Sequence, residues 1–247
     1  MCFLNQAWLS HQVQLNCGGG NHTCALTPLG GVKCWGYDYY GQLGDGGSNT
    51  DQPTPVDVSG LPSGVASITA GIHHTCAVTT SGAAKCWGRD NLGQLGDGGT
   101  NTNRPTPVDV SGLTSGVASI SAGAYHTCAV TTSGAAKCWG YDEYGQLGDG
   151  GTNTDKTTPV DVSGLTSGVA SISAGSNHTC AVTTAGAAKC WGLGNGQLGD
   201  GGTNTDKTTP VDVSGLTSGV ASISAGSNHT CAVTTAGAAK CWGLGNG

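Results

Sequence analysis

The sequence repeats itself with a period of 51 to 52 residues, and this periodicity limits the fold more than any other feature. The tripeptide His-Thr-Cys recurs with its cysteine at positions 24, 76, 128, 180 and 231, which gives spacings of 52, 52, 52 and 51 residues. The stretch Gln146–Gly196 is identical to Gln197–Gly247. Such repetition is typical of arrays in which each unit packs on its neighbours. We therefore divide the chain into an N-terminal cap and five repeats, the last of them partial: 1–18, 19–70, 71–122, 123–174, 175–225 and 226–247.

Each repeat contains four segments that read as β-strands. In one unit they are β-branched or alternate between apolar and polar residues: Thr106–Val110, Val117–Ala122, His126–Thr131 and Ala135–Trp139. Glycine supplies 45 residues and only 10% of the residues are charged, so strands and turns are favoured over helices. Four strands in a unit of this length is the content of a propeller blade. The sequence predicts an all-β, β-propeller-like fold of tandem four-stranded blades.

The repeat resembles that of the regulator of chromosome condensation family. The resemblance rests on Gly123–Gly134 (GAYHTCAVTTSG), on Trp139-Gly140 and on Gly145–Gly148 (GQLG), which recur in register. It implies a β-propeller, usually of seven blades, here in a cysteine-paired variant of the bacterial or extracellular kind. The resemblance implies little about function, because such repeats serve as exchange factors, light sensors, ubiquitin-ligase parts and secreted inhibitors. Where family members commonly carry Asn three residues after the tryptophan, this chain has Asp38, Asp90, Asp142, Gly194 and Gly245.

Ten of the twelve cysteines form pairs that are ten residues apart. Counting outward from the predicted hairpin loop 80–82 places Cys76 opposite Cys86, with both sulfurs on one face of the hairpin. Zinc held with the nearby His74 is disfavoured, because neither a fourth ligand nor a short Cys-x2-Cys spacing is present, and free thiols are the other alternative. We predict cross-strand disulfides at Cys24–Cys34, Cys76–Cys86, Cys128–Cys138, Cys180–Cys190 and Cys231–Cys241, and a further pair, Cys2–Cys17, outside the repeat pattern.

One histidine and one tryptophan recur in each repeat. No Ser or Asp repeats beside the histidines in a triad-like relation, so we interpret them as structural hydrogen-bonding groups and the tryptophans as packing anchors between blades. No catalytic, cofactor-binding or metal-binding residue is predicted, and the chain is not expected to be an enzyme. The histidines are His22, His74, His126, His178 and His229, and the tryptophans are Trp35, Trp87, Trp139, Trp191 and Trp242.

Oxygen-bearing side chains recur in the polar loop between repeats, as at Asp149, Asn153 and Asp155. Calcium would accept such ligands, but the second copy of the loop has Asn103 at the last position and no acidic residue closes the loop as in an EF-hand. We therefore expect Asx turns there instead of a calcium site.

Three sequons and two threonine-rich loops are candidate glycosylation sites. Each sequon lies directly before a predicted strand, which argues against its use. The candidate N-glycosylation sites are Asn21, Asn177 and Asn228, and the candidate O-glycosylation sites are Thr152, Thr154, Thr157, Thr158, Thr203, Thr205, Thr208 and Thr209.

Charge and cysteine content restrict the partners and the compartment. The net charge is −6, so no basic surface is available for nucleic acid or anionic lipid. No apolar run approaches the length needed to cross a bilayer, and residues 1–12 lack the pattern of a signal peptide. The even set of twelve cysteines favours an oxidising compartment, and we expect an extracellular or cell-surface location.

The length of the chain leads to a prediction of self-assembly. A seven-bladed ring would need 7 × 51 = 357 residues, whereas the chain has 247, so an open or superhelical array is favoured over a closed ring. A closed ring of five blades is the alternative, since propellers have four to eight blades. Near-identical repeats favour a structural role, because recognition of one asymmetric partner needs different side chains in different blades. We predict a non-catalytic extracellular building block of a fibre or surface appendage whose partner is a second copy of itself, joined head to tail, with attached glycans as a further expectation. The alternative is a soluble secreted propeller that binds or inhibits a protein partner.

Overall fold

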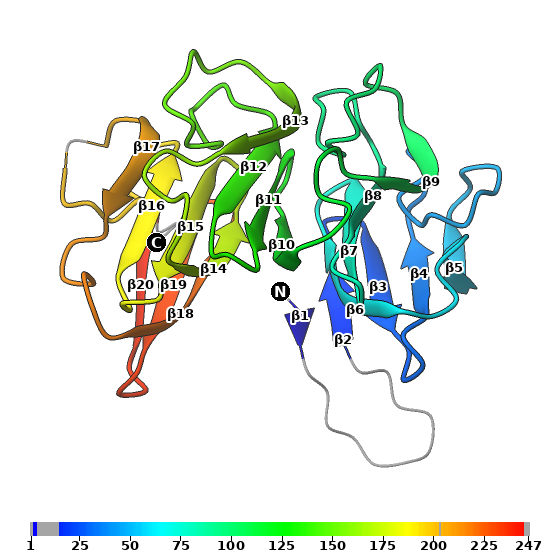
Figure 1. Ribbon diagram of the computed structural model, residues 1–247, viewed down its shortest axis with the longest axis horizontal. Helices are drawn as coiled ribbons and strands as arrows, with labels where there is room; N and C mark the ends of the chain where they lie inside the picture. Colours follow the sequence, from blue (N-terminus) through cyan, green and yellow to red (C-terminus); the bar gives the residue numbers. More distant parts are fainter. Residues whose placement is uncertain (1, 4–14, 203, 245–247) are drawn as a thin grey trace.

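The described residues form twenty strands in five antiparallel sheets (Figure 1). The computed structural model describes residues 2–3, 15–202 and 204–244. Sheet 1 consists of β1 (Cys2–Phe3), β2 (Leu15–Gly18), β3 (His22–Leu26), β4 (Val32–Gly36) and β5 (Gln52–Asp57). Sheet 2 consists of β6 (Val65–Ala70), β7 (His74–Thr79), β8 (Ala84–Gly88) and β9 (Arg104–Asp109).

The remaining sheets repeat this plan. Sheet 3 consists of β10 (Val117–Ala122), β11 (His126–Thr131), β12 (Ala136–Gly140) and β13 (Lys156–Asp161). Sheet 4 consists of β14 (Val169–Ala174), β15 (His178–Thr183), β16 (Ala188–Gly192) and β17 (Lys207–Asp212). Sheet 5 consists of β18 (Val220–Ala225), β19 (His229–Thr234) and β20 (Ala239–Gly243). The part of the chain that the structure describes contains no helix that could span a membrane.

The sheets are offset by one strand from the sequence repeats. Strand β6 falls in the repeat 19–70, yet it pairs with β7, which opens the next repeat. In sheet 1 the corresponding place is taken by β2, and β1 is added beside it with Cys2 opposite Cys17. The offset arises because a repeat fixes the period of the chain, whereas hydrogen bonding decides which strands share a sheet. The side chains of Cys2 and Cys17 lie outside the described part, so their disulfide stays a prediction.

The hairpins have the register that the sequence predicts. Cys76 lies opposite Cys86, and Val78 lies opposite Ala84. Gly82 has a φ of +80°, a conformation in which a residue with a side chain would be strained. Two strands of the reference unit have the predicted bounds, and the other two, β9 and β12, differ from the prediction by one or two residues at each end.

The hydrophobic core lies in layers between consecutive sheets. In one layer, Cys76, Val78 and Leu95 pack with Ala129 and Trp139, which belong to the following sheet. Trp87, Trp139 and Trp191 are fully buried in such layers. The tryptophans at these positions are therefore packing anchors between blades, as the sequence predicts.

The five sheets form an open arc, with sheet 1 on the right of Figure 1 and sheet 5 on the left. The strands of different sheets that lie in close contact belong to consecutive sheets, as β7 with β10, β11 with β14 and β15 with β18. The strand order in every sheet is linear, so no sheet closes into a barrel. The all-β, open, propeller-like array predicted from the sequence is the observed fold.

Candidate interaction surfaces

A threonine hydroxyl at the centre of each contact between sheets links a histidine to a backbone carbonyl. Between sheets 2 and 3, His74 Nε2 lies 2.9 Å from Thr127 Oγ1, and that hydroxyl donates to the carbonyl of Gln94 at 2.8 Å. Because the hydroxyl has a single hydrogen, His74 must donate to it through Nε2. Trp139 Nε1 donates to the same Gln94 carbonyl at 3.0 Å. The Gln94 carbonyl, in a loop of sheet 2, therefore accepts hydrogen bonds from two side chains of sheet 3.

The same arrangement recurs at all four contacts between the described sheets. The distances from histidine Nε2 to threonine Oγ1 are 2.7 Å for His22–Thr75, 2.9 Å for His74–Thr127, and 2.8 Å for both His126–Thr179 and His178–Thr230. Burial lowers the pKa of His74 and His126 to about 3 and that of His22 and His178 to about 4. These histidines are neutral at pH 7 and have the structural hydrogen-bonding role that the sequence predicts.

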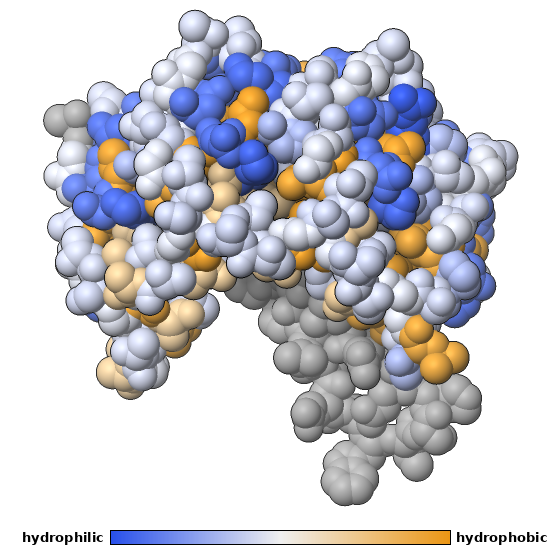
Figure 2. Space-filling view, in the orientation of Figure 1, coloured by the Kyte–Doolittle hydropathy of each residue, from blue (hydrophilic) through white to orange (hydrophobic). Residues whose placement is uncertain are grey.

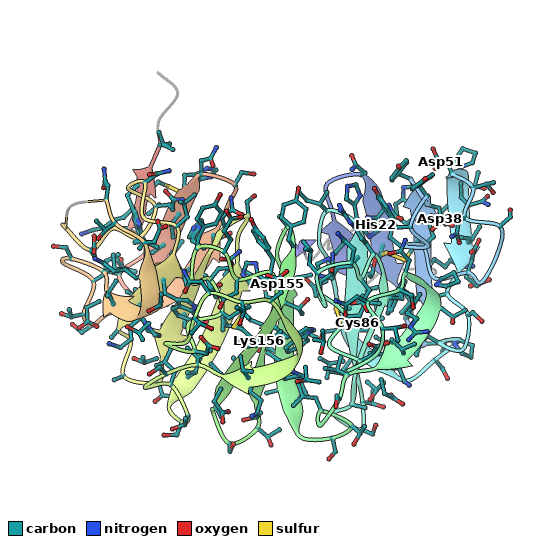
Figure 3. All side chains as sticks on the ribbon, turned by 90° about the horizontal axis from the view of Figure 1, so that it is seen from above. His22, Asp38, Asp51, Cys86, Asp155 and Lys156 are labelled. Atoms are coloured by element: carbon teal, nitrogen blue, oxygen red, sulfur yellow. A yellow bond between two sulfur atoms is a disulfide. The ribbon has the colours of Figure 1, made fainter. Side chains whose placement is uncertain are left out.

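The Gly-Gln-Leu-Gly motif positions this carbonyl. Gly96 has a φ of +70°, and a Cβ there would lie 2.6 Å from Trp139 Nε1, so only glycine permits the close approach. Asp90 Oδ1 accepts the amide of Leu95 at 3.0 Å and thereby holds the loop. Burial raises the pKa of Asp90 to about 6. In sheet 1, Asp38 has the same place, and its amide donates to the neighbouring Asp51 at 3.0 Å (Figure 3).

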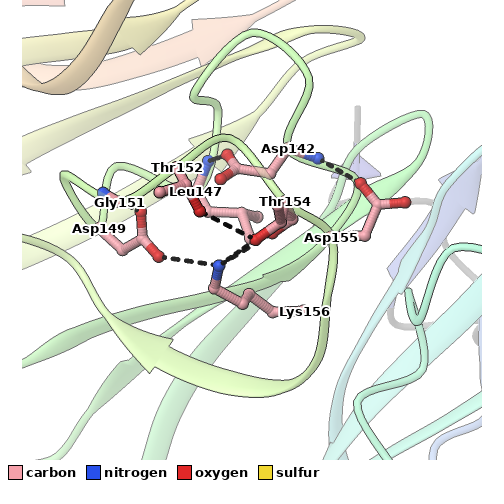
Figure 4. A network of polar contacts seen from close by, with 8 residues as sticks. All are labelled: Asp142, Leu147, Asp149, Gly151, Thr152, Thr154, Asp155 and Lys156. Carbon is pink, nitrogen blue, oxygen red and sulfur yellow. Dashed lines mark hydrogen bonds and ion pairs between the residues drawn. The ribbon is translucent and has the colours of Figure 1, made fainter.

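The acidic loop is built from Asx turns and ion pairs (Figure 4). Asp149 Oδ1 accepts the amide of Gly151 at 2.8 Å, and its Oδ2 lies 3.4 Å from Lys156 Nζ. Asp155 Oδ1 accepts the amide of Asp142 at 3.0 Å. The Asx turn is confirmed, and the carboxylates face backbone amides and a lysine. The residues that the structure describes contain no group of three or more His, Cys, Asp or Glu side chains that could hold a metal.

The cysteine pairs are bonded. Disulfides join Cys24–Cys34, Cys76–Cys86, Cys128–Cys138, Cys180–Cys190 and Cys231–Cys241, and no free cysteine occurs among the described residues. The first four bridges are fully buried between sheets. These bonds take the place of the zinc and free-thiol alternatives for the ten cysteines concerned.

Sheet 5 exposes the face that sheets 1 to 4 bury. We call the exposed side chains of His229, Val233 and Cys241 the sheet 5 face. Val233 is 41% exposed, whereas Val182, which corresponds to it in sheet 4, is 3% exposed. On the side of the molecule shown in Figure 2, apolar residues otherwise occur in small groups between hydrophilic ones.

A second surface consists of aromatic side chains at the ends of sheets 1 to 3. We call Tyr37, Tyr39, Tyr40, His73, Arg89, Tyr125, Tyr141 and Tyr144 the tyrosine cluster. The ring centroids of Tyr40 and His73 are 4.9 Å apart, and those of Tyr125 and Tyr141 are 6.0 Å apart. The Arg89 guanidinium joins the two halves, because it lies 5.0 Å from the Tyr40 centroid and 6.0 Å from that of Tyr125.

A cavity of about 380 Å³ opens beside Arg89 in this cluster. It is lined by Leu92, Tyr125, Tyr141, Tyr144 and Asn177, together with Arg89 itself. The interpretation of the sequence missed this site, because it treated the loops as near-identical. The signal was present in the differences between repeats: the residue after Trp-Gly is Tyr37, Arg89, Tyr141, Leu193 and Leu244 in turn.

The candidate glycosylation sites differ in accessibility. Asn21 and Asn228 are exposed, whereas Asn177 is partly buried at the cavity beside Arg89. Thr157 and Thr208 are partly buried, and Thr203 lies outside the described residues. The other five threonines are exposed: Thr152, Thr154, Thr158, Thr205 and Thr209. Their modification stays a prediction.

Comparison with known proteins identifies the class of repeat. The model of the RCC1-like domain family matches residues 5–247. The chain is 35% identical over 241 residues to the ultraviolet-B receptor UVR8 of Arabidopsis thaliana, and the match covers 94% of this chain and 53% of the receptor. It is 37% identical over 209 residues to the probable E3 ubiquitin-protein ligase HERC4 of Homo sapiens, which covers 82% of this chain and 19% of the ligase. The chain therefore belongs to the RCC1-like repeat family.

Solved structures agree with this assignment. Yeast RCC1 (Prp20), in its complex with Kap60, superposes with a TM-score of 0.81 at 24% identity, covering 95% of this chain and 57% of that chain. Human WBSCR16 superposes with a TM-score of 0.80 at 25% identity, and the match covers 91% of this chain and 60% of WBSCR16. The chain thus spans about half to three fifths of the length of UVR8 and of these two propellers.

Proposed function

We propose that this chain is a non-catalytic structural repeat protein that binds a second copy of itself, head to tail, through the sheet 5 face. The observation that carries the proposal is that the same amino-acid sequence occurs in sheet 4 and in sheet 5 and is buried differently in the two. In sheet 4 this face is covered by sheet 5, and in sheet 5 the same residues are exposed. A surface that is complementary to a blade of this repeat is therefore available on sheet 5.

Sheet 1 offers the complementary surface. In sheets 2 to 5 the contact with the preceding sheet uses a threonine and a tryptophan, such as Thr75 and Trp87, and both of these are fully buried. The corresponding Thr23 and Trp35 of sheet 1 are partly exposed. A second copy whose sheet 1 lies against sheet 5 would place Thr23 near His229. Such a contact is heterologous, so it continues into a fibre unless the rotation between copies closes a ring.

The disulfides support an extracellular or cell-surface location for this assembly. Each bridge closes a short hairpin, and bonds of this kind persist in oxidising compartments and are rare in reducing ones. Each one contributes roughly 2–3 kcal/mol in the chain-entropy account. A fibre exposed to the environment would benefit from blades that stay folded independently of large apolar side chains.

The experiment is a measurement of mass against concentration by light scattering, with electron microscopy of the same samples. We expect the wild-type chain to form assemblies larger than 24.3 kDa as the concentration rises. Val233→Glu places a charge in the sheet 5 face and should leave a monomer. Leu29→Glu is the matched control, because Leu29 is 84% exposed in the loop between β3 and β4, outside the sheet 5 face. A wild-type chain that stays monomeric at every concentration would contradict the proposal.

A second candidate function is the binding of a different protein through the loop ends of the sheets. The tyrosine cluster favours it, since Tyr and Arg are enriched in the centres of protein interfaces. The two functions use different surfaces, so Val233→Glu should abolish self-assembly and leave binding at the tyrosine cluster unchanged.

A further inference from the structure

We propose that the cavity beside Arg89 binds a peptide segment of a partner protein, one that carries a carboxylate next to an apolar or aromatic side chain. The inference is independent of self-assembly, because it concerns the loop ends of sheets 1 to 3 and the start of sheet 4, whereas the sheet 5 face lies at the end of the arc. Three observations support it: the repeats differ from one another at this surface, Arg89 has no ion-pair partner among the described residues, and the aromatic rings form a continuous row.

The differences between otherwise near-identical repeats converge at this surface. The residue before the recurring histidine is Asn21, His73, Tyr125, Asn177 and Asn228 in turn, and His73, Tyr125 and Asn177 belong to the cluster or its cavity. The residue after Trp-Gly varies in the same repeats. A surface that recognises one asymmetric partner needs different side chains in successive blades, and this surface has them.

Arg89 differs from the other cations of the chain. Seven of the nine lysine and arginine side chains form an ion pair with an aspartate, and within the described residues Arg89 and Lys240 do not. Lys240 lies in sheet 5, whose described strands do not include an equivalent of β17, the strand that carries Asp212 opposite Lys189 in sheet 4. Arg89 lies in the middle of the array, and its Nε donates to Asn91 Oδ1 at 2.6 Å.

The remaining nitrogens of Arg89 can therefore take a carboxylate. The Cζ atom of its guanidinium lies 5.0 Å from the ring centroid of Tyr40 and 6.0 Å from that of Tyr125, and these ring contacts use no N–H donor of the group in a hydrogen bond to a carboxylate. Carboxylates bind arginine through paired hydrogen bonds along its edge. The titratable groups around the site are His73, whose pKa is lowered by burial and by Arg89 so that its ring is neutral at pH 7, and Glu143, which accepts a hydrogen bond from the hydroxyl of Tyr141. Arg89 is thus the positive centre of the cavity.

The aromatic rings form a continuous row that suits an extended chain. Ring contacts run from Tyr39 to Tyr40, across Arg89 to Tyr125, and on to Tyr141 and Tyr144. Tyrosine gives a large contact area at a small cost in side-chain entropy, and with Arg it is the residue type that dominates the centres of binding surfaces. Leu92 adds an apolar side chain to the lining of the cavity.

The test uses fluorescence polarisation with pairs of labelled peptides that differ at one residue, X-X-Phe-Asp-X-X and X-X-Phe-Asn-X-X, where X denotes mixed positions. We expect the full-length chain to bind the Asp pool at least tenfold more tightly than the Asn pool. Arg89→Gln should remove this preference. Arg104→Gln is the matched control, since Arg104 is paired with Asp97 outside the cluster and its loss should leave the preference intact. Tyr125→Ala should weaken binding of both pools, and Tyr125→Phe should retain it.

Thermal unfolding of each variant, followed by circular dichroism, shows whether the fold is kept. Equal binding of both pools, no binding of either pool, or an unchanged preference in a folded Arg89→Gln variant would overturn the proposal. Tight binding of a sialylated oligosaccharide in place of the Asp peptides would also overturn it and would assign the cavity to an acidic glycan.

Discussion

Three strands of sheet 4 (β14–β16) and the three strands of sheet 5 (β18–β20) contain the same residues in two different environments, which separates the effect of sequence from the effect of a neighbour. The segments Gln146–Gly196 and Gln197–Gly247 are identical, and β14–β16 and β18–β20 have the same strand register. Nevertheless His178 and Val182 are buried, whereas His229 and Val233 are exposed. The hairpin is therefore a local property, and the burial of its outer face depends on the next sheet.

This difference shows where the stability of the array arises. Repeat arrays gain stability from each unit and from the contacts between neighbours. Sheet 4 has both contacts, and sheet 5 has one. Substitutions at equivalent positions in the two sheets should consequently have unequal effects, and those effects measure the contribution of the contact between sheets.

The largest effect is expected at the tryptophans. Trp191→Ala should lower the free energy of unfolding by about 3–5 kcal/mol, because it removes a fully buried side chain and leaves a cavity. Trp242→Ala should lower the free energy of unfolding clearly less, because Trp242 is partly exposed. Trp242 still donates to the Gln197 carbonyl, as Trp191 does to the Gln146 carbonyl. Urea denaturation followed by circular dichroism gives both values. Equal losses would mean that the partial exposure of Trp242 does not reduce its contribution to stability.

The next effect is expected at Gly148. Both Gly148 and Gly164 have a φ of +72°, but a Cβ on Gly148 would lie 2.5 Å from Trp191 Nε1, whereas nothing lies within 4 Å of a Cβ on Gly164. Gly164→Ala should cost about 1 kcal/mol of backbone strain. Gly148→Ala adds a steric clash and should cost about 3 kcal/mol. If the two variants unfold at the same urea concentration, the close approach of loop and tryptophan is not required.

Acid should loosen the contact between sheets 4 and 5. The pKa of His178 is about 4 in the folded chain, whereas a histidine exposed to water has a pKa of 6.5, so the unfolded state binds more protons between these two pH values. The contribution of the neutral His178 to the free energy of unfolding is complete above pH 6.5. It falls as the pH drops toward 4, by at most about 1.4 kcal/mol per pH unit.

The other contacts contain an opposing group. Burial raises the pKa of Asp38, Asp90 and Asp142 to about 6, so each of these carboxyls adds stability as the pH falls from about 6 to about 4. The equivalent position in sheet 4 is Gly194, which has no carboxyl group. The stability lost in acid through His178 is therefore not offset there. Urea titrations at pH 7 and 4.5 should show that His178→Gln reduces the acid sensitivity of the chain. An unchanged pH dependence would show that His178 does not limit stability in acid.

The smallest effect is expected at the surface ion pairs. Lys189 Nζ lies 2.7 Å from Asp212 Oδ1, with 27% and 57% of the two side chains exposed. Exposed pairs of this kind contribute about 0.2–1 kcal/mol. Lys189→Ala should therefore have a small effect that decreases with added salt, and the unpaired Lys240→Ala should have none. A loss above about 2 kcal/mol would mean that Lys189 acts through packing of its aliphatic part.

Much of this structure could be predicted from the sequence, because local rules decide it. The hairpin register follows from the loop Thr80–Gly82, and the cross-strand position of Cys76 and Cys86 follows from that register. The role of His74 as a structural group was also predictable, since no reactive residue recurs beside it. These inferences needed only one repeat, and the repetition then extended them to the others.

The remaining features depend on contacts between repeats. The offset of the sheets from the repeat boundaries could not be predicted, because strand pairing across a boundary leaves the sequence period unchanged. The tyrosine cluster joins Tyr40, Arg89 and Tyr125, which are about fifty or thirty-five residues apart and come from loops of three different repeats. Only the arrangement of consecutive sheets brings them together.

The most direct test of the account is hydrogen exchange measured by mass spectrometry in sheets 4 and 5, at a concentration at which the chain is monomeric. Since the two segments yield identical peptides, Thr235→Ser in the exposed loop between β19 and β20 gives peptides that include this residue a different mass. The account predicts that amides of β15 exchange at least tenfold more slowly than the equivalent amides of β19, because both strands are paired on two sides but only sheet 4 is covered on both faces. Equal exchange in the two sheets would contradict the claim that contacts between consecutive sheets stabilise the blades.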